Sequence, residues 1–123
     1  METTSNLNTW AAMFAAMQEN CQVVRQSGRS MINPKSPEHS IPPESYVEVR
    51  PVSGRTIEWG EVYCIYTDGG HDIKRLYPGD DDEHLKCVSF NESEGFLPYQ
   101  LPKSEIKGLA LVTRVLQIKS LHW

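Results

Sequence analysis

Short apolar runs separated by strong turn signals constrain the fold of this chain more than any other feature of its sequence. Gly, Pro, Asp and Asn mark turns at 53–54, 68–70, 78–80 and 91–95. The runs between these turns are rich in β-branched and aromatic residues, which is typical of strands. We expect strands over Cys21–Gln26, Tyr46–Val52, Glu61–Thr67, Asp72–Tyr77, His84–Phe90 and Ile106–Ile118. The pattern predicts a mainly β fold.

The segments outside these strands differ in character. Apolar residues at helical spacing over Leu7–Glu19 predict a short amphipathic helix, so we divide the chain into an N-terminal helical segment at 1–20 and a β domain at 21–123. Four prolines in Met31–Ser45 predict an irregular loop without regular structure. The acidic run Asp80–Glu83 predicts a solvated hairpin end, because it lacks the ligand spacing of a calcium loop.

Size and charge narrow the class of protein. The chain has 123 residues, enough for one domain with a real core. Its formal net charge is −4 and its basic residues are scattered, which disfavours nucleic-acid binding by this chain alone. The longest apolar stretch, Trp10–Met17, is too short to cross a membrane, and no leader is evident, so we expect a cytoplasmic protein.

The three cysteines occur at positions 21, 64 and 87, an odd number without the C-x-x-C spacing of metal and redox sites. We therefore expect thiols buried in strands rather than a disulfide framework or a zinc site. The chain implies no cofactor or metal ion.

Two residues can carry chemistry together. Ser30 lies in the turn Gly28–Met31, and Lys74 lies among apolar residues in a predicted strand, on the face that it shares with Leu76. A serine hydroxyl becomes a nucleophile when a neighbouring base takes its proton, and a lysine can be that base when it is neutral. Burial favours the neutral amine. We therefore predict that the Ser30 hydroxyl and the Lys74 amine lie within hydrogen-bond reach.

The turn around Gly28 adds a second element. Glycine permits a tight backbone in which successive N–H groups can converge on one point. The backbone amides of Arg29 and Ser30 could then form an oxyanion hole, with Met31 anchoring the turn to the core.

Simpler interpretations remain open for each residue by itself. Ser30 alone reads as a surface turn, and Lys74 alone reads as a solvated strand residue. A Ser-His-Asp triad is an alternative, but the four histidines, His39, His71, His84 and His122, lie in turns, loops or the tail. None of them has an evident carboxylate to orient it.

Four short motifs follow one another along most of the chain. They are Ser27–Met31 (SGRSM), Ser45–Val49 (SYVEV), Gly60–Tyr63 (GEVY) and Ile73–Leu76 (IKRL), and the run KGLALV at 107–112 closes the series. In this order they resemble the C-terminal domain of the LexA-like self-cleaving peptidases, a family that includes lambda-type phage repressors and UmuD-like polymerase subunits. The resemblance covers residues 21–118, and the Pro-rich insert after Met31 is most similar to the lambda type.

The resemblance implies a LexA-like and signal-peptidase-like β-ribbon domain that forms a homodimer. It implies a Ser-Lys dyad with Ser30 as nucleophile, Lys74 as general base and the Arg29 and Ser30 amides as oxyanion donors. The family cleaves its own upstream linker in response to RecA filaments, so a RecA filament or an antirepressor protein is an expected partner. DNA would be bound only through a separate domain, and no membrane partner is expected.

The sequence departs from the family pattern in three ways. Arg29 precedes the nucleophile where an acidic residue, Asn or Met is usual, and Pro43-Glu44 replaces an Asp-Gly pair. The third departure is that no Ala-Gly or Cys-Gly pair precedes Ser30, so the bond that the family cleaves is missing. The helix-turn-helix of the family is not recognisable either. We therefore expect no self-cleavage in cis of the sequence as given.

Four functions follow from this comparison. The leading hypothesis is the dimerisation and latent self-cleavage domain of a phage or prophage repressor that responds to the SOS signal. The alternatives are a UmuD-like polymerase accessory subunit, a non-catalytic regulator that keeps the fold to bind a protein partner, and a signal peptidase relative. The last is disfavoured because it would be expected to carry a membrane anchor.

Overall fold

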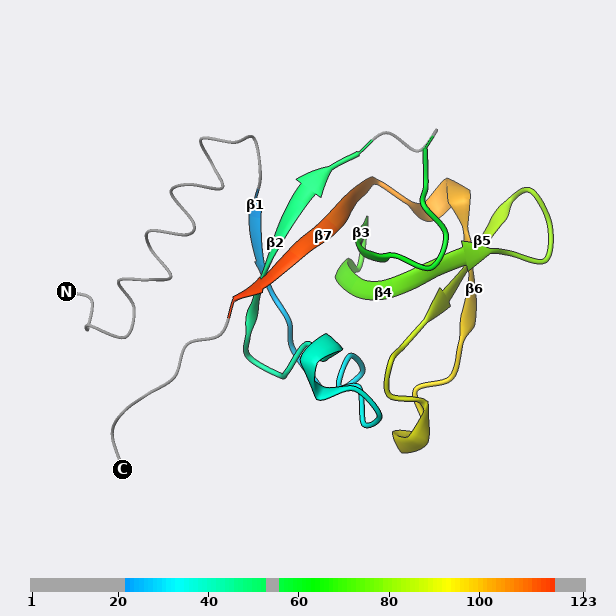
Figure 1. The fold of residues 1–123 in the computed structure, drawn as a ribbon. Helices are drawn as coiled ribbons and strands as arrows, with labels where there is room; N and C mark the ends of the chain where they lie inside the picture. Colours follow the sequence, from blue (N-terminus) through cyan, green and yellow to red (C-terminus); the bar gives the residue numbers. More distant parts are fainter. Residues whose placement is uncertain (1–21, 53–55, 117–123) are drawn as a thin grey trace, which may run out of the picture.

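The computed structural model describes residues 22–52 and 56–116, which form seven strands and three short 3-10 turns (Figure 1). The predicted helix over 7–19, and with it the whole 1–20 segment, lies outside the described residues. The strands are β1 (Gln22–Arg25), β2 (Tyr46–Pro51), β3 (Val62–Thr67), β4 (Gly70–Pro78), β5 (His84–Val88), β6 (Tyr99–Pro102) and β7 (Gly108–Leu116). The fold is mainly β, as the spacing of turns predicts.

All seven strands belong to one antiparallel sheet in the order β1-β2-β7-β3-β4-β5-β6. The sheet curls on itself like an incomplete barrel (Figure 1). Strand β7 is the last of the described strands in sequence but lies between β2 and β3, pairing Val49 with Val112 on one side and Cys64 with Ala110 on the other. It therefore joins the β1-β2 pair to the β3-β6 meander.

Both faces of the central strands are buried. One cluster contains Met31, Ile41, Val47, Val49, Cys64, Ile73 and Ala110, and the other contains Tyr63, Ile65, Leu76, Leu85, Cys87 and Leu109. Cys64 and Ile65 are adjacent in β3 but belong to opposite clusters, because successive side chains of a strand point to opposite faces. A side chain in the middle of these strands therefore packs against apolar groups on whichever face it points to.

Most predicted strands match observed ones, with two corrections. Strand β6 has no predicted counterpart, because it is short, mostly exposed and bracketed by Pro98 and Pro102, which are signals of a loop. The Met31–Ser45 segment is a loop, but the expectation that it lacks all regular structure is wrong, since Pro37–His39 forms a single 3-10 turn. The acidic run Asp80–Glu83 does form the end of the β4-β5 hairpin.

The state of the cysteines and the possibility of a membrane span can both be compared with the structure. Cys64 in β3 and Cys87 in β5 are free and fully buried, as predicted, whereas Cys21 lies outside the described residues. In the described ranges, no helix has the length and hydropathy that spanning a bilayer requires.

Burial should make the two strand thiols unreactive. Removal from water raises the pKa of the Cys87 thiol to about 11 and also raises the pKa of the Cys64 thiol, so little thiolate is present near neutral pH. We expect both residues to remain unmodified when the native protein is treated with iodoacetamide, and to react after urea unfolding. Peptide mapping by mass spectrometry measures this, and alkylation of either residue in the native state would contradict the packing described.

A buried carboxylate ties β2 to β7. Glu48 is 4% exposed and lies at a β-bulge, where the register shifts between Glu48 and Val49. Its Oε1 accepts hydrogen bonds from Thr113 Oγ1 at 2.7 Å and from Arg114 Nε at 3.1 Å. These donors, Thr113 first, lower the pKa of the Glu48 carboxyl below its ordinary value. The ionised form is therefore the one that the fold stabilises.

This arrangement predicts a pH-dependent loss of stability. Because the folded pKa of Glu48 is lowered, its contribution is complete above the unfolded value of about 4.5 and falls as the pH drops through the folded value. We expect Glu48→Gln to lower the free energy of unfolding by about 1–3 kcal/mol at neutral pH. The difference from the wild type should shrink in acid. Urea unfolding of both proteins at neutral and at acidic pH measures this difference. A difference that stays the same in acid would contradict the stabilising role of the ionised Glu48 carboxylate.

Candidate functional site

Ser30 and Lys74 meet in the folded protein. Ser30 lies in the turn that follows β1, and Lys74 lies in the middle of β4. The Lys74 Nζ lies 2.9 Å from the Ser30 Oγ, which is the hydrogen-bond distance predicted from the sequence. Ser30 is 8% exposed and Lys74 is 6% exposed, so the contact is largely removed from water. Residues 44 positions apart thus form one polar pair against the core.

The nucleophile turn has the backbone geometry that Gly28 permits. Gly28 has a φ of +79°, in the left-handed region where a side chain would be strained, although open space surrounds its Cα. Met31 is fully buried in one core cluster and anchors the turn, as predicted. No acceptor among the described residues is hydrogen-bonded to the backbone N–H of Arg29 or Ser30. Both amides are thus free of intramolecular bonds to the described part of the chain.

A second turn holds the first one in place. Asn91 is 1% exposed and precedes the 3-10 turn Glu92–Glu94. Its backbone N–H donates to the Ser30 carbonyl at 3.0 Å, and its side-chain Nδ2 donates to the Arg29 carbonyl at 2.9 Å. Its own Oδ1 accepts from Ser93 Oγ. Asn91 therefore donates to two successive backbone carbonyls, those of Arg29 and Ser30, and so fixes the turn that carries the serine.

An ion pair reinforces this junction at the surface. The Arg29 guanidinium donates from Nε and Nη2 to the two carboxylate oxygens of Glu94, both at 2.8 Å. The bidentate contact with Arg29 lowers the pKa of Glu94 to about 2. The Arg29 side chain thus has a carboxylate partner of its own in the Glu92–Glu94 turn.

Lys74 has a second partner on its own strand. Asp72 Oδ1 lies 3.1 Å from the Lys74 Nζ, and Asp72 Oδ2 accepts a hydrogen bond from the Tyr99 hydroxyl at 2.9 Å. The carboxylate side chain is about half exposed, while the lysine is not. The site therefore consists of a connected set, Ser30–Lys74–Asp72–Tyr99, supplied by the turn, β4 and β6.

Sequence reasoning missed three members of this site. Asp72 could have been found, because residues two apart in a strand share a face and Asp72 precedes Lys74 by two. Asn91 and Tyr99 carry no local signal, since their partners lie 62 and 27 residues away in the chain.

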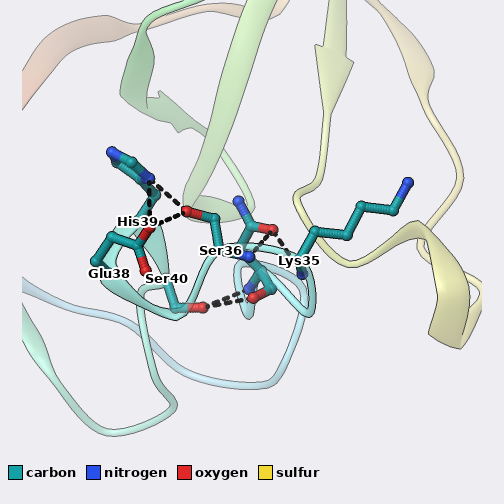
Figure 2. Close-up of polar contacts among 6 residues, drawn as sticks. Lys35, Ser36, Glu38, His39 and Ser40 are labelled. Atoms are coloured by element: carbon teal, nitrogen blue, oxygen red, sulfur yellow. Dashed lines mark hydrogen bonds and ion pairs between the residues drawn. The ribbon is translucent and has the colours of Figure 1, made fainter.

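The histidine alternative can be compared with the structure at one place, shown in Figure 2. His39 Nδ1 lies 2.6 Å from Ser36 Oγ, and the same hydroxyl donates to Glu38 Oε1 at 2.9 Å. In a catalytic triad the carboxylate binds the imidazole nitrogen opposite the serine. Here serine and glutamate both approach the Nδ1 side, with Glu38 3.9 Å from it, so the cluster lacks the order of a triad.

The other histidines have different contacts. His84 Nδ1 lies 2.7 Å from Asp81 at the hairpin end, and the bond to Asp81 raises the pKa of the imidazole. His71 Nε2 contacts the carbonyl of Arg25. His122 lies outside the described residues. None of the histidines in the described part of the chain contacts Ser30.

One surface hollow lies apart from the Ser30–Lys74 pair. A hollow of about 470 Å³ lies between the Pro37–His39 turn and β7, where His39, Arg75 and Val112 contribute to its walls. Arg75 follows Lys74 in β4 and therefore points to the opposite face of the sheet. The hollow and the Ser30–Lys74 pair are accordingly separate features.

Comparison with known proteins adds no assignment. No protein-family model matches the chain, and no curated protein matches it.

The junction around Asn91 should matter for stability. Asn91→Ala removes the hydrogen bond to the Arg29 carbonyl and leaves a small cavity, so we expect a loss of about 2 kcal/mol in the free energy of unfolding. The matched control is Glu92→Ala in the same turn, an exposed residue whose truncation should cost less than about 0.5 kcal/mol. Urea unfolding measures both, and equal effects would contradict a specific role for Asn91.

Proposed function

We propose that this chain is the dimerisation and latent self-cleavage domain of a phage or prophage repressor, with a LexA-like fold. The observation that carries the proposal is the 2.9 Å contact between Lys74 Nζ and Ser30 Oγ. An ordinary strand lysine extends its amine into water, whereas this one is buried against a serine on a glycine turn. The mainly β architecture and the order of the four motifs support the same proposal.

The proposed chemistry is acyl transfer to Ser30. Neutral Lys74 takes the proton from Ser30 Oγ while the oxygen attacks the carbonyl carbon of a peptide bond. The backbone N–H groups of Arg29 and Ser30 hold the oxyanion that forms. Lys74 then gives its proton to the leaving amine as the C–N bond breaks. Water, activated by the same amine, hydrolyses the acyl-serine and restores both residues.

The proposed biological role is regulation in the cytoplasm of a bacterial or phage-infected cell. A symmetric dimer of this domain would bring two separately folded DNA-binding domains to paired half-sites. Cleavage between the domains would uncouple them and weaken operator binding. RecA filaments or an antirepressor protein are the proposed triggers.

One observation favours a second candidate, a non-catalytic regulator that binds a protein partner. The Asp72 carboxylate lies 3.1 Å from Lys74 Nζ, and a nearby negative charge favours the ammonium form, which cannot accept a proton. A site without a base to activate Ser30 could not cleave a peptide bond, and the domain would then serve only to bind a protein partner.

Labelling with a fluorophosphonate separates the two candidates. Attack by Ser30 Oγ forms an O–P bond, expels fluoride and delivers the hydroxyl proton to Lys74. We expect labelling of the wild type at Ser30 to be faster at alkaline than at neutral pH, because only a neutral amine can accept the serine proton. Ser30→Ala and Lys74→Met should lose it by at least about 100-fold. Intact mass and peptide mapping measure the label.

Ser104→Ala is the matched control, because Ser104 is an exposed serine of the Lys103–Glu105 turn. This variant should be labelled at the wild-type rate. Circular dichroism verifies that Lys74→Met is folded. Absence of label on Ser30 at both neutral and alkaline pH, or equal labelling in Lys74→Met, would overturn the peptidase proposal and leave the binding role.

A further inference from the structure

The Asp72 carboxylate connects the Ser30–Lys74 pair to the edge strand β6. We propose that Asp72 is a positioning residue that keeps Lys74 in its ammonium form and so holds Ser30 inactive at neutral pH. This inference rests on the proposed function, since it concerns the regulation of the same site.

The carboxylate is fixed by three donors. Asp72 Oδ1 accepts from Lys74 Nζ and from the Ile73 backbone N–H, both at 3.1 Å. Asp72 Oδ2 accepts from the Tyr99 hydroxyl at 2.9 Å. Both oxygens are therefore occupied, and a fixed carboxylate interacts with a buried ammonium more strongly than a mobile one.

The remaining groups around Lys74 carry no competing negative charge. Ser30 faces it from the turn, Tyr63 lies opposite it in β3, Cys87 lies on β5 and Tyr99 lies on β6. Burial raises the pKa of Cys87 and Tyr99, so both are neutral near pH 7. Among the described residues that face Lys74, Asp72 is thus the one that carries a negative charge.

The next ionisable groups along the chain or across the sheet are paired or neutral. Arg29, next to Ser30, is paired with Glu94. Cys64, which pairs with Ile73, has a raised pKa because it is buried. Asp72 is therefore the group whose removal should change the charge on Lys74 most.

An ammonium at this position would donate to both Ser30 Oγ and Asp72. Such a lysine has no lone pair for the serine proton, which leaves the hydroxyl a weak nucleophile. The Asp72 side chain is 51% exposed, whereas the Lys74 side chain is 7% exposed, so the carboxylate is the accessible partner. Disengaging Asp72 would leave Lys74 in a largely apolar environment, where the neutral amine is favoured.

The test compares Asp72→Asn with the wild type in two measurements. The first is the pH profile of fluorophosphonate labelling at Ser30, whose rising limb should move to lower pH. Labelling near neutral pH should become about tenfold faster. The second is the ¹³Cε chemical shift of Lys74 in protein labelled with ¹³C-lysine, whose titration midpoint should also move to lower pH.

Two further variants keep the test decisive. Asp72→Ser removes the charge with a smaller side chain and should shift both profiles in the same direction. Asp68→Asn removes an exposed carboxylate from the neighbouring turn and should leave both profiles unchanged. Amide NMR spectra report whether each variant keeps the fold.

The two measurements separate failure of the inference from failure of the proposed function. A Lys74 titration that is unchanged in both Asp72 variants would overturn the inference, whatever the labelling shows. Slower labelling of Asp72→Asn at every pH would also overturn it, because Asp72 would then assist catalysis. A shifted titration without any label on Ser30 would support the role of Asp72 and overturn the peptidase activity.

Discussion

Burial of both faces of the central sheet is the constraint on which the other features depend. Strands β3, β4 and β7 carry apolar side chains on alternate faces, and each face packs against its own cluster. Because β7 pairs with both β2 and β3, the sheet is complete only when the last described strand is in place. The loops that hold the candidate site are then attached to a framework that leaves little room for a misplaced side chain.

Among the described residues, one carboxyl side chain and one lysine side chain are buried within this framework, and each has specific partners. Glu48 is held by Thr113 and Arg114 at the β2-β7 bulge, and Lys74 is held by Ser30 and Asp72 at β4. Among the described residues, no fully buried side-chain nitrogen or oxygen is left without a hydrogen bond. Burying a polar or ionisable group costs much less free energy when it is hydrogen-bonded in this way, so both groups are compatible with a stable fold.

The surroundings of Lys74 combine burial with two polar partners. Its amine is largely removed from water and contacts both the Ser30 hydroxyl and the Asp72 carboxylate. The fold is compatible with a latent enzyme and with a non-catalytic regulator. Asp72 lies on the exposed side of the pair and can be reached without opening the core.

The sequence by itself determined the strands and the two central residues of the site. Alternating apolar residues and Gly/Pro turns are local signals, and they predict six of the seven strands. The motif order predicts that Ser30 and Lys74 approach each other. Only the tertiary structure decided three other features: the short strand β6, the hydrogen bond from Asn91 to the Arg29 carbonyl, and the Tyr99–Asp72 bond. Each depends on which strands pair and in which register, and those contacts join segments whose local sequences contain no trace of their partners.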